Sequence, residues 1–376
     1  MPNMNYLTAC QFDFGAVKGL GAAMRRLGIA RPLLVSDAGL KAAGLIETVL
    51  GHIPNGPGAV FDTAPINPSE AACRAAAEVY RAAQCDGLIA LGGGSPIDLA
   101  KGAGLVLTHE GPLARLGASQ RGTRLIGPIP PLIAIPTTAG TGSEVSVGAM
   151  VILEDGRKET LISPHLIPSL AICDPELTLG LPSSLTAATG MDALTHCVEA
   201  VLSTMIHPPA EAIGLDGLER LFARGWLARA VEDGSDREAR WQVMMASYQG
   251  ALAFVKGLGA VHGLSHGLGR LADLRLHHGT LNAILLPHSL AMLAGHAEEK
   301  LARLRKAMEI SAGADVAEAI AQLNARIKIP ANLGAIGVRA EHLALALDYA
   351  VSDLATNSNA RKFGPAEYEE LFKRAL

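Results

Sequence analysis

Histidine residues are concentrated in one part of the 376-residue chain, where they could bind a metal ion together. The chain has 12 histidines, and even spacing would place about three of them in any window of 105 residues. The window from residue 192 to residue 296 instead holds eight: His196, His207, His262, His266, His277, His278, His288 and His296. Such an excess favours a shared chemical role for several of them.

Two spacings within this window suit metal binding. Asp192 and His196 are four residues apart, which places a carboxylate and an imidazole on one face of a helix. His262 and His266 repeat that spacing. A carboxylate with two or three imidazoles is a site for a divalent ion such as Fe²⁺ or Zn²⁺, and an ion with an open position would act as a Lewis acid.

A further pair, His277 and His278, could complete such a site. Spacing does not decide between the two, because adjacent residues point about 100° apart on a helix. The alternative for any single histidine is an ordinary core or surface imidazole. The sequence therefore predicts a metal site without fixing its last ligand.

Two loops in the first half of the chain suit a nucleotide. The apolar run 87–91 predicts a buried strand, and Gly92-Gly-Gly-Ser-Pro-Ile-Asp98 predicts a turn that opens a helix, where backbone N–H groups favour a phosphate. This motif is neither a Rossmann fingerprint nor a Walker loop, and on its own it could be a tight turn. A second loop rich in hydroxyl groups, residues 136–144, follows the strand predicted at 131–135. Two such loops at the carboxyl ends of strands in one sheet indicate a nucleotide site.

Asp37 ends another predicted strand, residues 31–37. Its carboxylate could accept hydrogen bonds from an adenosine ribose and would repel a 2′-phosphate, which favours NAD over NADP. The alternative is that Asp37 caps the helix that follows.

The elements that must position these residues form two domains. Up to about residue 182, short apolar runs alternate with Ala-rich helical segments such as 71–83, which predicts a mostly parallel sheet with flanking helices. From residue 183 to residue 376, only helical spacing continues. We therefore expect an α/β nucleotide-binding domain (1–182) and an all-α metal-binding and substrate domain (183–376).

Composition narrows the class of protein. With 49% hydrophobic and 18% charged residues, the chain is expected to be compact, and a net charge of −4 argues against a nucleic-acid partner. Five scattered cysteines fit a reducing compartment. The first eight residues carry no signal-peptide pattern, and no apolar stretch reaches membrane-spanning length, so we expect a cytoplasmic protein.

Six blocks in this order resemble the iron-dependent (group III) alcohol dehydrogenase family. They are Gly92-Gly-Gly-Ser-Pro-Ile-Asp98, Pro136-Thr-Thr-Ala-Gly-Thr-Gly-Ser-Glu144, Cys173-Asp-Pro-Glu-Leu177, Gly190-Met-Asp-Ala-Leu-Thr-His196, Gly257-Leu-Gly-Ala-Val-His262-Gly-Leu-Ser-His266 and His278-Gly-Thr-Leu-Asn-Ala-Ile-Leu-Leu-Pro287. The resemblance spans nearly the whole chain. It implies a nucleotide-binding α/β domain, a helical domain and a protein that is a homodimer or a larger homo-oligomer.

The resemblance also implies roles for individual residues. The metal ligands would be Asp192, His196, His262 and His278, with His266 beside the metal as the catalytic proton relay. The cofactor would be bound by Asp37, Gly93, Gly94, Ser95, Asp98, Thr137 and Thr138. NAD is expected rather than NADP, and Fe²⁺ is expected with Zn²⁺ as the alternative.

Lys256 departs from the family pattern, because simple-alcohol enzymes of the family often carry a small polar residue there. We interpret it as a partner for a carboxylate on the substrate. The alternative is an ordinary solvated lysine near a helix end.

Together these observations predict a metal-dependent oxidoreductase. It would transfer a hydride between a nicotinamide cofactor and a small alcohol or aldehyde, or a hydroxy or keto acid resembling 4-hydroxybutyrate or maleylacetate. The first alternative is an NAD- and metal-dependent lyase or cyclase resembling dehydroquinate synthase, which would need a cluster of basic residues near the metal. The second is a nucleotide sensor without catalysis.

Overall fold

The computed structural model of the protein describes residues 8–376. Chain contacts divide these residues into two compact units. The α/β unit comprises the described residues up to 138 together with 142–178, and the helical unit comprises 179–376 together with the short segment 139–141. The division at 178/179 lies close to the predicted boundary at residue 182.

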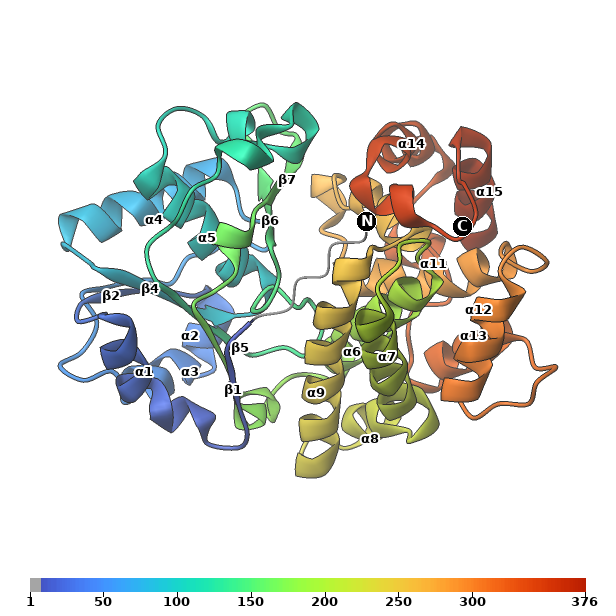
Figure 1. Ribbon diagram of the computed structural model, residues 1–376, viewed down its shortest axis with the longest axis horizontal. Helices are drawn as coiled ribbons and strands as arrows, with labels where there is room; N and C mark the ends of the chain where they lie inside the picture. Colours follow the sequence, from blue (N-terminus) through green and yellow to red (C-terminus); the bar gives the residue numbers. More distant parts are fainter. Residues whose placement is uncertain (1–7) are drawn as a thin grey trace. The chain divides into compact units, whose positions relative to one another are not determined.

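A six-stranded parallel sheet is the centre of the α/β unit (Figure 1). Its strands, in spatial order, are β1 (Cys10–Phe12), β8 (Leu170–Cys173), β5 (Leu132–Pro136), β4 (Gly87–Gly92), β2 (Pro32–Val35) and β3 (Ala59–Phe61). Strands β3, β2, β4, β5 and β8 follow the order 2-1-3-4-5 of a doubly wound sheet. The strand order therefore reverses between β2 and β4, which is where such sheets bind ligands.

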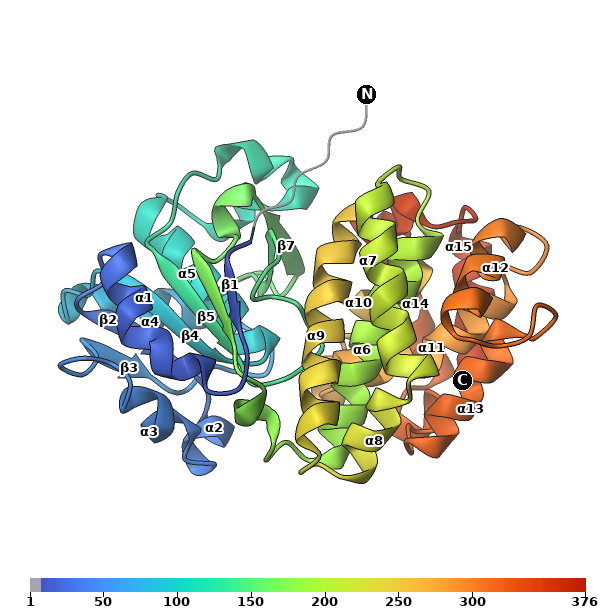
Figure 2. The ribbon, with the colours of Figure 1, turned by 60° about the horizontal axis from the view of Figure 1, so that its bottom comes forward.

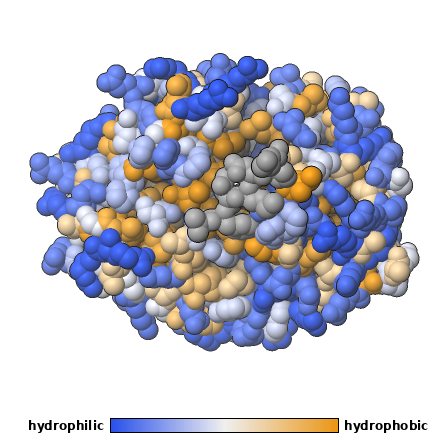
Figure 3. Space-filling view, in the orientation of Figure 1, coloured by the Kyte–Doolittle hydropathy of each residue, from blue (hydrophilic) through white to orange (hydrophobic). Residues whose placement is uncertain are grey.

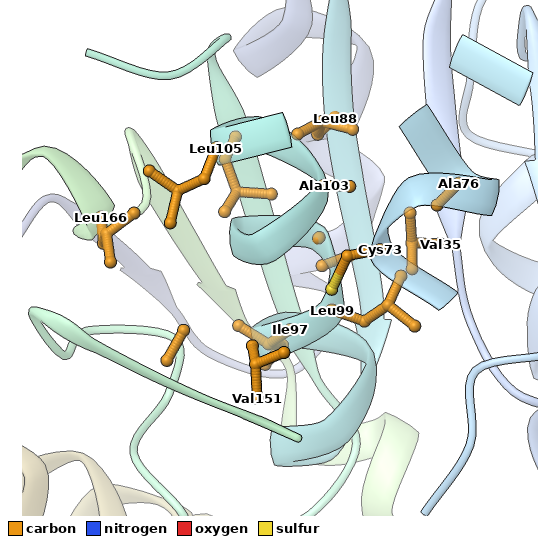
Figure 4. Packing of buried hydrophobic residues seen from close by; sticks show 14 of the residues in the cluster. Val35, Cys73, Ala76, Leu88, Ile97, Leu99, Ala103, Leu105, Val151 and Leu166 are labelled. Carbon is orange, nitrogen blue, oxygen red and sulfur yellow. The ribbon is translucent and has the colours of Figure 1, made fainter. Parts of the chain in front are cut away.

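Both faces of this sheet are buried, which explains why its strands are apolar throughout. On β2, Leu33 and Val35 pack in one hydrophobic cluster and Leu34 packs in the other. Figure 4 shows Val35 and Leu88 of the first cluster beside residues of two covering helices. Those helices are α4 (Glu70–Ala82) and α5 (Gly94–Thr108), while α1 (Leu20–Leu27), α2 (Ala38–Ala42) and α3 (Leu45–Leu50) lie toward the opposite face (Figure 1).

A two-stranded antiparallel hairpin, β6 (Gly148–Ile152) and β7 (Lys158–Ile162), packs on α5. Its alternating burial, with Ala149 and Val151 buried and Met150 half-buried, is typical of a strand that covers a core on one face only. The hairpin was not expected from the sequence.

The helical unit contains only helices among its described residues (Figure 2). They are α6 (Ser183–Leu202), α7 (Pro208–Leu218), α8 (Trp226–Glu232), α9 (Arg237–Ala253), α10 (Ala260–Leu268), α11 (His278–Ala291), α12 (Glu298–Ala307), α13 (Val316–Arg326), α14 (Leu343–Ser352) and α15 (Pro365–Ala375). α6 contacts α7, α9 and α11 and is buried on nearly all sides. A helix so surrounded is apolar all round, so its few polar side chains require partners.

The predicted fold class is confirmed. The strands expected at 31–37, 87–91 and 131–135 are β2, β4 and β5, and the helix expected at 71–83 is α4. None of the described helices has the length and apolar character needed to cross a membrane. Hydrophilic residues are abundant on the face in Figure 3. The N-terminal stretch expected to lack a signal pattern lies almost entirely outside the described residues.

Candidate metal centre and nucleotide loops

Helix α6 supplies the first two predicted metal ligands. Asp192 and His196 are one helical turn apart, and both are buried, with 1% and 4% of their surface exposed. The turn between them carries small and apolar side chains, so α6 can be packed on every side at this level. A carboxylate buried this deeply requires a neighbouring positive charge or hydrogen-bond donors.

Helices α10 and α11 bring the other two ligands to Asp192. His262 lies in the first turn of α10, and His278 is the first residue of α11. Gly279 permits the approach of α11 to α6, because a Cβ atom at this position would lie 2.1 Å from the carbonyl oxygen of Ala188. A glycine directly after His278 thus has a steric reason in this chain.

Three imidazole nitrogens surround one oxygen of Asp192. The Nε2 atoms of His196, His262 and His278 lie 3.8, 3.7 and 3.7 Å from its Oδ1. Two ligands of one cation with bonds of about 2.1 Å lie roughly 3–4 Å apart. Of the four groups that the resemblance implied as ligands, Asp192, His196 and His262 have ligand atoms that all lie within 4.8 Å of one another, a spacing that suits one divalent ion. His278 approaches this cluster from the side of the Asp192 carboxylate.

The structure favours His278 over His277 at this site. His277 precedes α11, and its buried Nδ1 atom has no hydrogen-bond partner among the described residues. Burial lowers the pKa of His277, which favours a neutral imidazole. Of these two adjacent histidines, the one found within 4 Å of the Asp192 carboxylate is His278.

Asn282, one turn after His278, is a residue that sequence reasoning missed. Its Nδ2 atom lies 2.7 Å from Oδ1 of Asp192, 3.2 Å from Nε2 of His262 and 3.1 Å from Nε2 of His278. An amide N–H donates to these nitrogens only if their lone pairs point inward. The donor set is thus arranged as a cation requires, and the residues present fit a bound metal. The spacing of four residues from His278 was the available signal.

Glu199 is a second missed residue. Its Oε2 atom lies 2.6 Å from Nδ1 of His262, and its Oε1 accepts a hydrogen bond of 2.9 Å from the backbone N–H of Val261. A carboxylate at Nδ1 holds the proton there and leaves Nε2 free to bind a metal. Glu199 lies three residues after His196 on α6, so helical spacing could have shown it.

The charges of this cluster shift one another's protonation. Burial, the largest effect, raises the pKa of Asp192, but the imidazoles of His196, His278 and His262 outweigh it and hold the pKa below its usual range. Burial lowers the pKa of His196 to about 4. Burial also acts to lower the pKa of His262, but Asp192 and Glu199 outweigh it and raise that pKa to about 9. The carboxylate stays ionised, as a metal ligand must.

His266 lies beside this centre and is more exposed. Its Nδ1 atom is 2.9 Å from Oδ2 of Asp353, and its ring stacks on that of His278 with centroids 5.2 Å apart. Its side chain is 15% exposed, against 1% for His262. His266 is therefore oriented by a carboxylate and lies toward the open side of the metal centre.

Lys256 is not the solvated lysine of our alternative interpretation, which is wrong. Its side chain is buried, because η8 (Phe254–Lys256) packs against α6 and α7. Its Nζ atom lies 2.9 Å from Oε2 of Glu211 and donates to the carbonyl oxygen of Val201. The ammonium group is already neutralised within the protein, so this geometry gives no support to a role in binding a substrate carboxylate.

The two predicted nucleotide loops begin side by side in the α/β unit. Gly92 and Pro136, the last residues of β4 and β5, are paired in register. A Cβ atom at Gly93 would lie 3.2 Å from Oγ1 of Thr138, and that buried oxygen has no hydrogen-bond partner among the described residues. A narrow space beside glycine, with an unsatisfied hydroxyl and the N-terminus of α5, fits a phosphate group. Gly94 begins α5, and Thr137 is buried beside Gly92.

The remaining predicted cofactor residues already have partners. Oδ1 of Asp37 accepts hydrogen bonds from Gly39 and Leu40, so Asp37 does cap α2, at the carboxyl end of β2. The hydroxyl of Ser95 donates to the carbonyl oxygen of Ile66. Oδ2 of Asp98 accepts a hydrogen bond of 2.9 Å from the N–H of Met150 in the hairpin. These contacts hold the loops in shape, and Asp37 lies at the β2/β4 reversal where a ribose is expected.

The doubly wound sheet and the buried carboxylate–imidazole cluster define a class, the metal-dependent dehydrogenases of two domains. A family model described as iron-containing alcohol dehydrogenase matches residues 8–175, and one described as the C-terminal domain of the Fe-containing alcohol dehydrogenase family matches residues 186–376. The chain therefore belongs to the iron-containing alcohol dehydrogenase family. It is an oxidoreductase of the alcohol dehydrogenase kind.

Similar proteins agree over the full length. The chain is 48% identical to a 4-hydroxybutyrate dehydrogenase of Cupriavidus necator, over 99% of each sequence. It is 38% identical to a 1,3-propanediol dehydrogenase of Citrobacter freundii, over 100% of this chain and 98% of that one. A crystal structure of a 1,3-propanediol oxidoreductase superposes with a TM-score of 0.91 at 35% identity, over 100% of both chains. These names favour the dehydrogenase over the lyase alternative.

Proposed function

We propose that this protein oxidises the terminal hydroxyl group of a short hydroxy acid of the 4-hydroxybutyrate type, with NAD and a divalent metal ion, and catalyses the reverse reduction of the aldehyde. The observation that carries the proposal is the convergence of three imidazole nitrogens on Oδ1 of Asp192. The choice of substrate is supported by the similarity to 4-hydroxybutyrate dehydrogenase over nearly all of both sequences.

The metal would be held by Asp192, His196, His262 and His278, with Fe²⁺ favoured by the family and Zn²⁺ compatible with the same donors. These residues would hold a cation that supplies Lewis acidity toward the substrate oxygen, and the loops of the α/β unit would hold a nicotinamide cofactor as the hydride acceptor. Glu199 keeps a proton on Nδ1 of His262, which orients Nε2 inward.

His266 is the proposed proton relay. Asp353 accepts a hydrogen bond from Nδ1–H of His266, so Nε2 of His266 is the nitrogen that would receive the proton released from the hydroxyl group. The more exposed position of His266 lets it pass this proton to water. Oxidation of one alcohol then gives one aldehyde, one reduced nicotinamide and one proton.

The cofactor would lie along the carboxyl ends of β2, β4 and β5. Gly93, Gly94 and Ser95 at the start of α5 would contact the pyrophosphate, with Thr137 and Thr138 beside them. Asp37 would contact the ribose, and its negative charge disfavours NADP. Asp98 would support the loop through its bond to Met150.

The proposal also covers the cellular compartment and the oligomeric state. Free thiols at Cys10, Cys73, Cys85, Cys173 and Cys197 support a reducing compartment such as the cytoplasm. The family resemblance supports a homodimer or larger homo-oligomer, which size-exclusion chromatography with light scattering would test.

The deciding experiment follows the absorbance of NADH as it forms. It uses protein loaded separately with Fe²⁺ or Zn²⁺. We expect 4-hydroxybutyrate to drive NADH formation, with NAD preferred over NADP, and a chelator to abolish it. If neither metal form reduces NAD with any short alcohol, diol or hydroxy acid, the proposed function is wrong.

A further inference from the structure

One line of side chains on α10 leads outward from the metal centre. His262, His266 and Arg270 follow one another at intervals of four residues, from the first turn of α10 to the turn just after its end. Exposure rises along this line, from 1% for the side chain of His262 to 15% for that of His266, and Arg270 is half-buried. The neighbouring His278 side chain is 33% exposed. This side of the metal centre is therefore the open one.

Helix α14 lies along the same line and makes two successive contacts with it. Asp353, just beyond α14, pairs with His266, and Tyr349, one turn earlier, pairs with Arg270. The guanidinium carbon of Arg270 lies 5.3 Å from the centre of the Tyr349 ring. Stacking on an aromatic ring orients a guanidinium group while its N–H groups stay available at the edge.

Arg270 has no anionic partner in the part of the chain that the structure describes. Among residues 8–376, no carboxylate lies within 4 Å of its guanidinium group, which sets it apart from Lys256 with its Glu211 partner. A half-buried guanidinium group that lacks a counter-ion is stabilised most by a carboxylate that forms two parallel hydrogen bonds with it. The charge is available on the open side of the metal centre, where substrate must enter.

We propose that Arg270 binds the carboxylate of the substrate and so determines the preference for hydroxy acids over neutral alcohols. This inference rests on the proposed function. It transfers to Arg270 the role that sequence interpretation gave to Lys256.

Chain length decides which acids can use this contact. Arg270 lies eight residues beyond His262, about 12 Å along a helix axis, and helical side chains lean back toward the N-terminus. A four-carbon hydroxy acid spans roughly 6 Å from hydroxyl to carboxylate oxygen, and a hydrogen bond adds about 3 Å. A two-carbon hydroxy acid is roughly 2.5 Å shorter and falls short. We therefore expect 4-hydroxybutyrate to be preferred over glycolate.

The test compares Arg270→Gln and Arg270→Lys with wild type, using metal-loaded protein. The substrates are 4-hydroxybutyrate and 1,4-butanediol, which have the same length but differ in charge. For Arg270→Gln we expect kcat/KM for the acid to fall roughly 30- to 100-fold, mainly through KM, with the diol changed less than about threefold. Arg270→Lys should recover part of the loss. The control is Arg275→Gln, an exposed arginine in the same loop.

A binding measurement separates recognition from turnover. Calorimetry with butyrate, which carries the carboxylate but no hydroxyl group, should show binding to wild type and Arg275→Gln and none to Arg270→Gln, at equal metal content. Equal losses for acid and diol, or unchanged use of the acid, would overturn the assignment of Arg270. A wild-type enzyme that takes diols and rejects the acid would overturn the proposed substrate, and the Arg270 assignment with it.

Discussion

Two buried clusters of charged side chains, one in each unit, differ in where their positive charge comes from. In the α/β unit, Lys101 of α5 is fully buried beside Asp98 and Glu144, and its Nζ atom donates to the carbonyl oxygens of Ser146 and Gly148. In the helical unit, Asp192 pairs with no Lys or Arg among the described residues, and three imidazoles surround it instead.

This difference separates a structural cluster from a functional one. The ammonium group of Lys101 donates its hydrogen bonds to acceptors within the protein and so holds the hairpin against α5. It has no donor left for a ligand. Three imidazoles around one carboxylate are instead groups that can ligate a cation supplied from outside the protein. The chemistry of the positive partner, an ammonium group in one cluster and imidazoles in the other, is therefore what distinguishes the candidate metal site.

The largest effect should come from removing one donor. His278→Ala should weaken metal binding by on the order of 10³-fold and abolish activity, because a three-donor site lacks one of its bonds. The adjacent His277→Ala should keep its metal, and Lys101→Met should keep it too while it lowers stability. Metal content after dialysis measures all three. Retention by His278→Ala with loss by His277→Ala would reverse the assignment of the two histidines.

His266→Gln should affect turnover and leave the metal in place. General acid–base groups contribute about 10²–10⁴-fold, so we expect kcat to fall by at least about 100-fold at equal metal content. Loss of metal from this variant would show that His266 is a ligand.

Glu199→Gln should weaken metal binding by about 10- to 100-fold, the usual effect of removing a carboxylate behind a ligand histidine. The amide is the same size, but its neutral oxygen favours a proton on Nδ1 of His262 less strongly than the carboxylate does. Competition with a fluorescent chelator measures the affinity. The exposed Glu232→Gln in the same unit is the control, and equal affinities in the two variants would contradict the role of Glu199.

The features that could be predicted from the sequence are those that depend on the pattern of neighbouring residues. Continuous apolar runs showed β2, β4 and β5, because both faces of their sheet are buried. The three-residue strands β1 and β3 and the hairpin are too short or too mixed for such a signal. The spacing of four residues between Asp192 and His196 predicted them as a pair of metal ligands, because both lie on one helix.

The remaining site residues could not be found in this way, because their roles depend on contacts between helices. Glu199 meets His262 from another helix, and Asn282 reaches Asp192 across the α6–α11 contact. The alternative of a solvated Lys256 was wrong because burial by neighbouring helices is not visible in a single chain segment. Arg270 was missed for the same reason.

Lys256→Met should change stability and leave substrate recognition intact. The variant removes one partner of a buried ion pair, while Arg303 still contacts Glu211, so we expect a loss of about 2–3 kcal/mol in the free energy of unfolding. KM for 4-hydroxybutyrate should stay within about twofold of wild type. Urea unfolding and steady-state kinetics measure the two quantities. A raised KM at unchanged stability would return the substrate role to Lys256.

Two buried groups determine the pH dependence of stability in the α/β unit. Burial raises the pKa of Glu144 to about 7 and lowers that of Lys101 to about 8. Since the folded-state pKa of Glu144 lies above its usual value of 4.5, its contribution to stability is full below pH 4.5 and is lost as the pH rises to about 7. Since that of Lys101 lies below its usual 10.5, stability recovers between about pH 8 and 10.5.

Glu144→Gln should therefore flatten the fall in stability between pH 4.5 and 7, by up to about 3 kcal/mol. The exposed Glu110→Gln should leave the fall unchanged. Urea midpoints from circular dichroism at pH 5, 6, 7 and 8 measure it, with metal content checked at each pH. A metal centre whose donors must stay unprotonated has the opposite dependence, since protonation of its imidazoles releases the ion as the pH falls. If Glu144→Gln also altered metal retention, the two clusters would be coupled, and the separation of structural from functional charge would fail.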